Sequence, residues 1–321
     1  MFIFNPDQHL TPSYRIGPFT TADVGRNSKM LADDFAVQYF NSRFGQNKWQ
    51  YTFNGREAIR LALKKYELQA TDLVTILTTS QNFYISSCVT NTIESFCQWN
   101  RELTPETKLI FVNHEFGYPY PNMQELVATG LPIIEDCCTT FFSQDEAGAV
   151  GSYGDFSVYS FPKFFPIQIG GLLVSNRSKD FQVNSRLLNV EKQHIENVVS
   201  FYLRQEKSLL VTRKDNYDYA VRLFSKLGLI PRFSEHIKSI PSVLILSNNG
   251  VIHDLNQLKL SLYDHGIQNS IFYGEDAFFI PIHQNLRTSD LDYFYEVISF
   301  FVENGTISNY QSRFSEGNTN N

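Results

Sequence analysis

Short apolar runs alternate with amphipathic segments through the first half of the chain. The runs read as buried strands at 48–53, 72–79, 108–113 and 131–134. The segments after the first three of these runs have the 3.6-residue spacing of helices, at 56–65, 86–96 and 123–129. The alternation predicts an α/β fold with a mainly parallel sheet, in which functional side chains gather beyond the carboxyl ends of the strands.

The second half of the chain has a different order of predicted helices and strands. A helical pattern covers 192–226, and a further helix is expected at 28–44 in the first part of the chain. Strands are expected at 241–246 and 278–282, and helices at 253–265 and 288–302. These elements predict three regions: a large domain with a connecting helix at 1–225, a small α+β domain at 226–305, and a polar, disordered tail at 306–321.

Composition and charge argue against several classes of protein. The 321 residues carry a formal net charge of −6, which argues against nucleic acid or an anionic membrane surface as the main partner. No apolar run is long enough to span a bilayer, and the first residues do not predict a signal peptide, so we expect a cytoplasmic protein. The four cysteines and the histidines lack the spacing of a disulfide framework or a metal site.

One lysine stands in an unusual place. Lys163 is the only charged side chain between Asp155 and Arg177, and aromatic and proline residues flank it. The aromatic residues could cover its methylene stem while the ammonium group reaches water. Alternatively, desolvation could lower its pKa and make it a nucleophile that forms a Schiff base with a carbonyl substrate or with pyridoxal phosphate. The stretch alone leaves both interpretations open.

Two upstream features bear on this lysine. Asp136 follows the strand at 131–134, and a crossover could bring it to the same sheet edge as Lys163. Asn54 and Gly55 precede a helix, where a capping side chain and a close backbone approach suit an anion. Pyridoxal phosphate needs a lysine, an acid near its ring nitrogen, an aromatic face and an anion cradle. The chain has a candidate for each.

Several runs together resemble one protein family. They are IIEDCCTTF at 133–141, GSYGDFSVYSFPK at 151–163, IGGLLVSN at 169–176, NGREA at 54–58 and VNHEFGYP at 112–119. Their order and content are similar to those of the DegT/DnrJ/EryC1/StrS sugar aminotransferases. The resemblance implies the three-layer fold of the pyridoxal phosphate-dependent transferases, of the aspartate aminotransferase type, with a mainly parallel sheet and a smaller C-terminal α+β domain.

The resemblance also implies roles around the cofactor ring. Lys163 would hold pyridoxal 5'-phosphate covalently and shuttle the proton between cofactor and substrate. Asp136 would pair with the pyridinium nitrogen. Phe83 would stack on the ring, with Tyr84 as the alternative if the register shifts by one residue. Thr139 stands where the family usually has Gln or His near the ring oxygen.

The cofactor phosphate would bind at the start of the helix. By resemblance, Ser160 donates its hydroxyl, and the backbone of Gly55, Arg56 and Glu57 completes the cradle. Two departures fall here: Arg56 stands where the family commonly has Thr or Ser, and the interval between Ser160 and Lys163 is short.

The activity implied is transfer of an amino group from an amino acid, glutamate being the expected donor, to a nucleotide-linked keto-deoxysugar in surface-polysaccharide or glycoside biosynthesis. A homodimer is expected. The segment at 92–107 is shorter than in the family, and residues 177–215 lack its asparagine- and arginine-containing helix start. A non-catalytic binding or regulatory module on the same fold, or another pyridoxal phosphate-dependent sugar enzyme, therefore remains as an alternative.

Overall fold

The computed structural model describes residues 13–177, 181–233 and 238–304. Within these ranges the chain forms two compact units. The larger unit comprises 17–177, 181–210 and 238–242, and the smaller unit comprises 13–16, 211–233 and 243–304. The sequence-based boundary at 225/226 differs from this division. The tail expected at 306–321 lies outside the described residues.

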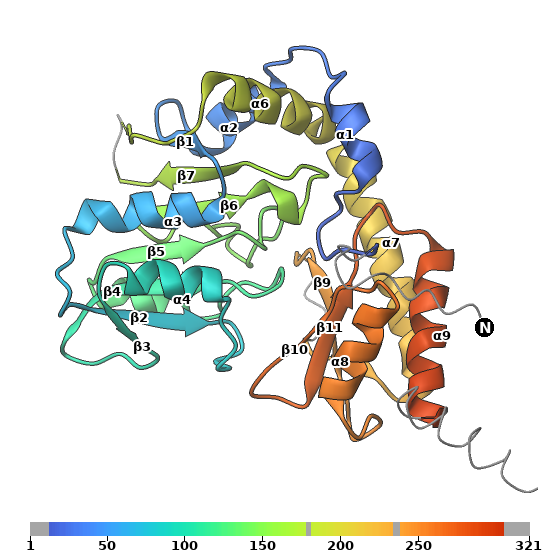
Figure 1. The fold of residues 1–321 in the computed structure, drawn as a ribbon. Helices are drawn as coiled ribbons and strands as arrows, with labels where there is room; N and C mark the ends of the chain where they lie inside the picture. Colours follow the sequence, from blue (N-terminus) through green and yellow to red (C-terminus); the bar gives the residue numbers. More distant parts are fainter. Residues whose placement is uncertain (1–12, 178–180, 234–237, 305–321) are drawn as a thin grey trace, which may run out of the picture. The chain divides into compact units, whose positions relative to one another are not determined.

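The larger unit contains a seven-stranded sheet (Figure 1). Its strands are β1 (Trp49–Thr52), β2 (Leu73–Thr78), β3 (Gln98–Asn100), β4 (Thr107–Asn113), β5 (Ile133–Asp136), β6 (Phe156–Ser160) and β7 (Gly171–Ser175). The spatial order is β1-β7-β6-β5-β4-β2-β3. The five adjacent strands β2, β3, β4, β5 and β6 are parallel. Strand β7 runs antiparallel to both β6 and β1. The predicted α/β class with a mainly parallel sheet is confirmed.

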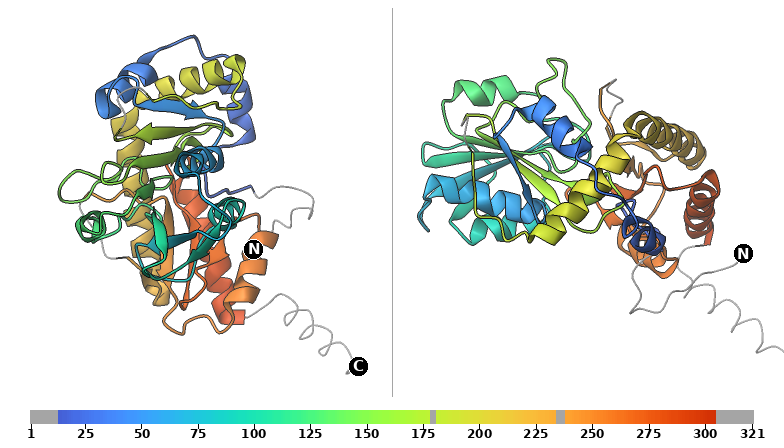
Figure 2. Two further views of the ribbon diagram at one scale, coloured as in Figure 1. Left: turned by 90° about the vertical axis from the view of Figure 1, so that its left-hand side faces the viewer. Right: turned by 90° about the horizontal axis from the view of Figure 1, so that it is seen from above.

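Helices cover both faces of this sheet (Figure 2). Leu109 and Phe111 of β4 pack with α3 (Gly55–Leu63) and α4 (Ser87–Glu94) on one face. The alternate residues Ile110 and Val112 pack with α5 (Met123–Ala128) on the other. A strand buried on both sides has apolar residues at every position, which is why the apolar runs were recognisable in the sequence.

A third cluster is dominated by aromatic side chains. It joins α2 (Phe35–Phe44) and α6 (Asn189–Leu203) to the segment after β6. The single helix expected at 28–44 is wrong in its first half, since α1 (Thr21–Asn27) ends before it and α2 begins at Phe35. The Asp33 carboxylate accepts the Phe35 N–H (3.0 Å) and pairs with Arg204, which fixes the start of α2 at that point.

The smaller unit has a four-stranded antiparallel sheet of order β10-β11-β9-β8. The strands are β8 (Ile230–Pro231), β9 (Val243–Ser247), β10 (Ser270–Ile271) and β11 (Ala277–Pro281), and the helices are α7 (Glu206–Phe224), α8 (Leu255–Asp264) and α9 (Thr288–Asn304). The helix expected at 192–226 is therefore two helices, α6 and α7. From residue 211 on, α7 belongs with the smaller unit, because Tyr217, Ala220 and Phe224 are buried in its core. Of the helices that the structure describes, none is both long and apolar enough to cross a membrane.

Gly171 shows how closely the strands approach beside the start of α3. It pairs with Thr52 on one side and Ser160 on the other, and a Cβ added there would lie 2.5 Å from the Tyr159 carbonyl oxygen. Replacing Gly171 with Ala should therefore lower the free energy of unfolding by about 1–3 kcal/mol, as overpacking does. Urea denaturation measures this change. The matched control is Gly25→Ala in α1, where a Cβ would meet nothing within 4 Å and no such loss is expected.

Candidate active site

Asp136 is the last residue of β5 and is buried. It pairs in register with Asn113 of β4 and Val158 of β6, so it lies at the carboxyl edge of the parallel strands. Its Oδ1 accepts the N–H of Cys138 (3.0 Å). Burial raises the pKa of this carboxyl group, while the hydrogen bond from Cys138 and, more weakly, the charge of Lys163 act in the opposite direction. A buried carboxyl group in this condition suits a cationic ligand.

Lys163 lies at the same edge, at the end of the short 3₁₀ turn η2 (Phe161–Lys163) that follows β6. Its charge acts on both Asp136 and Cys138. Of the two interpretations left open for this lysine, the structure agrees with the one in which its ammonium group reaches water: Lys163 is exposed, whereas Phe161 and Phe164 are completely buried in the aromatic cluster. The phenylalanines anchor the turn in the core and leave the lysine outside.

The start of α3 lies against the end of β6. A Cβ added to Gly55 would come within 2.8 Å of Cys138 Sγ and 3.2 Å of Ser160 Cβ, so only glycine permits this approach. The N–H groups of Gly55 and Arg56 belong to the first turn, where no intrahelical partner exists. The Glu57 N–H instead donates to the Asn54 side chain (2.9 Å). Its expected place in the phosphate cradle is therefore already taken by the helix cap.

The Glu57 side chain has a role that the sequence did not reveal. Its buried carboxylate accepts the N–H of Phe53 (2.6 Å), the hydroxyl of Ser185 (3.0 Å) and the N–H of Arg186 (2.8 Å). These bonds fasten the segment at 185–186 to the start of α3. The two partners are separated by about 130 positions in the chain, so no local pattern indicates this contact.

The remaining predicted residues follow β2 and β5 at the same edge. Phe83 is 81% exposed, and Tyr84 instead faces the ring of Phe116, with centroids 5.8 Å apart. The hydroxyl of Thr139 donates to the His114 carbonyl oxygen (2.8 Å). Phe83 thus has a ring face open to a ligand, whereas the hydroxyl proton of Thr139 is already used within the protein.

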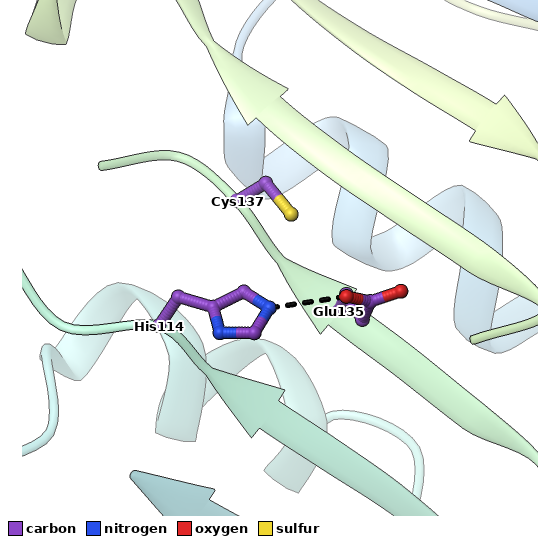
Figure 3. A group of neighbouring side chains, drawn as sticks. All are labelled: His114, Glu135 and Cys137. Carbon is purple, nitrogen blue, oxygen red and sulfur yellow. Dashed lines mark hydrogen bonds and ion pairs between the residues drawn. The ribbon is translucent and has the colours of Figure 1, made fainter. Parts of the chain in front are cut away.

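Beneath Asp136 lies a buried polar group made of His114, Glu135 and Cys137 (Figure 3). His114 Nδ1 accepts the N–H of Tyr120 (2.9 Å), so its proton is on Nε2, which donates to Glu135 (3.1 Å). The backbone N–H groups of residues 151 and 154 also donate to Glu135. The three potential ligand atoms lie within 4.8 Å of one another, but the imidazole and carboxylate are already hydrogen-bonded. We interpret the group as a brace that holds the ends of β4 and β5.

This set of residues fits pyridoxal phosphate. Among the described residues, no cation is bonded to the buried carboxyl group of Asp136, and a pyridinium nitrogen would provide one. The cradle at Gly55 is a space that a Cβ would fill, next to the hydroxyl of Ser160 and the free end of a helix. Lys163 supplies an accessible amine beside them.

Comparison with known proteins gives the same picture. Residues 95–193 match the model of the DegT/DnrJ/EryC1/StrS aminotransferase family. The resemblance to this family is therefore confirmed over that range. The matched range includes Asp136, Ser160 and Lys163 but not the start of α3.

Two curated relatives are sugar enzymes by name. The chain is 28% identical over 200 residues to GDP-perosamine synthase of Escherichia coli O157:H7, covering 52% of this chain and 53% of that protein. It is 25% identical over 207 residues to UDP-N-acetyl-3-dehydro-alpha-D-glucosamine 3-aminotransferase of Acidithiobacillus ferrooxidans, covering 57% of this chain and 53% of that protein. The match thus spans about half the length of these relatives.

Solved structures confirm the fold over most of the chain. The aminotransferase TlmJ from Streptoalloteichus hindustanus has a TM-score of 0.70 at 16% identity, covering 89% of this chain and 97% of that one. The sugar aminotransferase CalS13 from Micromonospora echinospora has a TM-score of 0.63 at 16% identity, covering 90% and 99%. The predicted transferase fold is therefore confirmed.

Asp136→Asn tests whether the carboxyl group is held at a cost to stability. When folding raises the pKa of a carboxyl group, the free energy of unfolding of the protein falls as the pH rises above the pKa of that group in the unfolded chain, which is about 4. Asn keeps an oxygen acceptor for the Cys138 N–H and removes the charge. The variant should therefore unfold at a higher temperature than the wild type without cofactor, by roughly 2–4 °C for each kcal/mol.

Thermal unfolding between pH 4.5 and pH 8 measures this difference, which should widen as the pH rises. Asp215→Asn, at an exposed position in α7, is the control and should show no such trend. A lower melting temperature for Asp136→Asn across this range would contradict the prediction.

Proposed function

We propose that the protein is a pyridoxal phosphate-dependent aminotransferase acting on a nucleotide-linked keto-deoxysugar, with an amino acid such as glutamate as donor. The observation that carries the proposal is the gathering of Asp136, Lys163, Gly55 and Ser160 at one edge of the sheet. The names of both curated relatives support a nucleotide-sugar substrate. A role in surface-polysaccharide or glycoside biosynthesis, a homodimeric state and a cytoplasmic location remain predictions from the sequence.

Each residue would have a distinct task. The cofactor supplies an electron sink for the bond broken at the substrate carbon. Asp136 would hold a positive charge at the ring nitrogen, which its burial makes favourable. Ser160 and the N–H groups at Gly55 and Arg56 would hold the phosphate, and Phe83 would cover the ring face.

Lys163 would bind the cofactor aldehyde covalently through its Nζ atom. After displacement by the amino donor, the same amine would carry the proton from the substrate carbon to the cofactor. Its position on a turn fastened by buried phenylalanines suits this task, because the backbone is fixed while the side chain can move.

Lys163→Ala provides the test of this proposal. Purified wild-type protein mixed with pyridoxal phosphate should show a visible absorption band, and borohydride should fix the cofactor on the peptide containing Lys163. The variant should lose both signals, and its amino transfer should fall by about 10²–10⁴-fold or more because the proton carrier is gone. Adding glutamate to the wild type should convert the visible band to the amine form of the cofactor.

Lys108→Ala is the matched control. Lys108 is exposed at the beginning of β4, at the opposite edge of the sheet, so its removal should leave the band unchanged. If the wild type binds no cofactor, the enzyme proposal fails and the binding-module alternative gains support. If the band forms but glutamate has no effect, the chain holds the cofactor without acting as a glutamate transaminase.

A further inference from the structure

A cavity of about 460 Å³ is lined by residues of α3 and α4 and of the segment before α6. Arg56 and Arg60 line it from α3, Arg186 lines it from the segment before α6, and the polar side chains of Ser87 and Asn91 line it from α4. Its size is in the range of small-molecule sites. Asp136, Ser160 and Lys163 do not line it, whereas Asn54 and Arg56 do, so it adjoins the cradle described above without including the lysine or its carboxylate.

Three arginines line this one cavity, in a chain with a net negative charge. Arg56 and Arg60 are four residues apart, so they share one face of α3, where like charges destabilise the helix. Among the ion pairs of the described residues, none includes Arg56 or Arg186, and Arg60 reaches only Glu57, at 3.8 Å. The repulsion would be relieved by an anion in the cavity.

Of the described residues that line the cavity, Glu57 is the one with a carboxylate, and its oxygens are engaged by Phe53, Ser185 and the Arg186 backbone. Its effect is to hold Arg186 beside the other two arginines. The Arg186 guanidinium also lies over the Phe53 ring, 4.4 Å from the centroid, which further orients it. The Arg186 backbone is thus fixed by a buried carboxylate, while the side chains of Arg56 and Arg186 are exposed and accessible to a ligand.

We propose that this arginine pocket binds the diphosphate of the nucleotide-linked substrate. The inference rests on the proposed function, and it goes beyond it by assigning substrate recognition to Arg56, Arg60 and Arg186. A diphosphate presents oxygens that planar guanidinium groups bind in pairs, and the positive N-terminal end of α4, where Ser87 lines the cavity, favours an anion as well. The single phosphate of the cofactor has its own candidate cradle at Gly55 and Ser160.

The test is titration calorimetry of the cofactor-loaded protein with uridine diphosphate and with guanosine diphosphate. Replacing Arg56, Arg60 or Arg186 with Gln should weaken binding of the preferred nucleotide roughly 5- to 30-fold each. Binding to the wild type should also weaken as salt is raised. The cofactor absorption band should persist in the Arg60 and Arg186 variants, whose residues take no part in the cofactor cradle. Arg222→Gln, an exposed change in α7, is the control and should bind as the wild type does.

Other outcomes would overturn the inference. The inference is wrong if the wild-type protein binds neither nucleotide. It is also wrong if the variants bind the nucleotide as tightly as the wild type does. Variants that lose the cofactor band but keep nucleotide affinity would assign the arginines to the cofactor phosphate. A change in sedimentation mass without a change in nucleotide affinity would assign them to a subunit contact. If nucleotide binding depends on the arginines but no cofactor band forms, the anion site stands and the aminotransferase proposal fails.

Discussion

The arrangement of the site depends on one carboxyl group held out of water at the end of a strand. Asp136 is buried at the edge where β4, β5 and β6 end together, and its bond to the Cys138 N–H does not offset the loss of hydration. The neighbouring pair of His114 and Glu135 keeps these strand ends in place through buried hydrogen bonds. The fold therefore holds a group that is unfavourable in isolation and becomes favourable when a cation is bound beside it.

The parallel sheet explains why residues far apart in sequence meet at this edge. Parallel strands all end on the same side, so the residues after β2, β5 and β6 share one rim, and the antiparallel pairs of β7 bring the start of α3 beside the end of β6. Gly55 and Gly171 permit the final approach, because a side chain at either position would collide with its neighbours. The strand topology thus brings these residues to one edge, and the two glycines allow the backbones to come into close contact there.

Much of this could be predicted from the sequence, for identifiable reasons. Buried strands have continuous apolar runs, and the Asp136 and Lys163 segments carry compact motifs, so the sheet and the edge were predictable. The exposure of Lys163 was not, because an aromatic neighbour can face either the lysine or the core, and the sequence does not say which. The bonds from Glu57 to the segment at 185–186 were also hidden, since they depend on tertiary contact alone.

The same limit explains why the arginine pocket was missed. In the sequence, Arg56 stood out only as an unusual residue in a phosphate loop, and Arg60 and Arg186 belonged to other segments. Folding places all three around one cavity, where the buried Glu57 carboxylate lies 3.8 Å from Arg60 and holds the backbone of Arg186. A helix start of this kind can offer its backbone to one anion and its outward side chains to another. This separation gives a physical reason for an arginine at a position where a small hydroxyl residue would serve the cofactor alone.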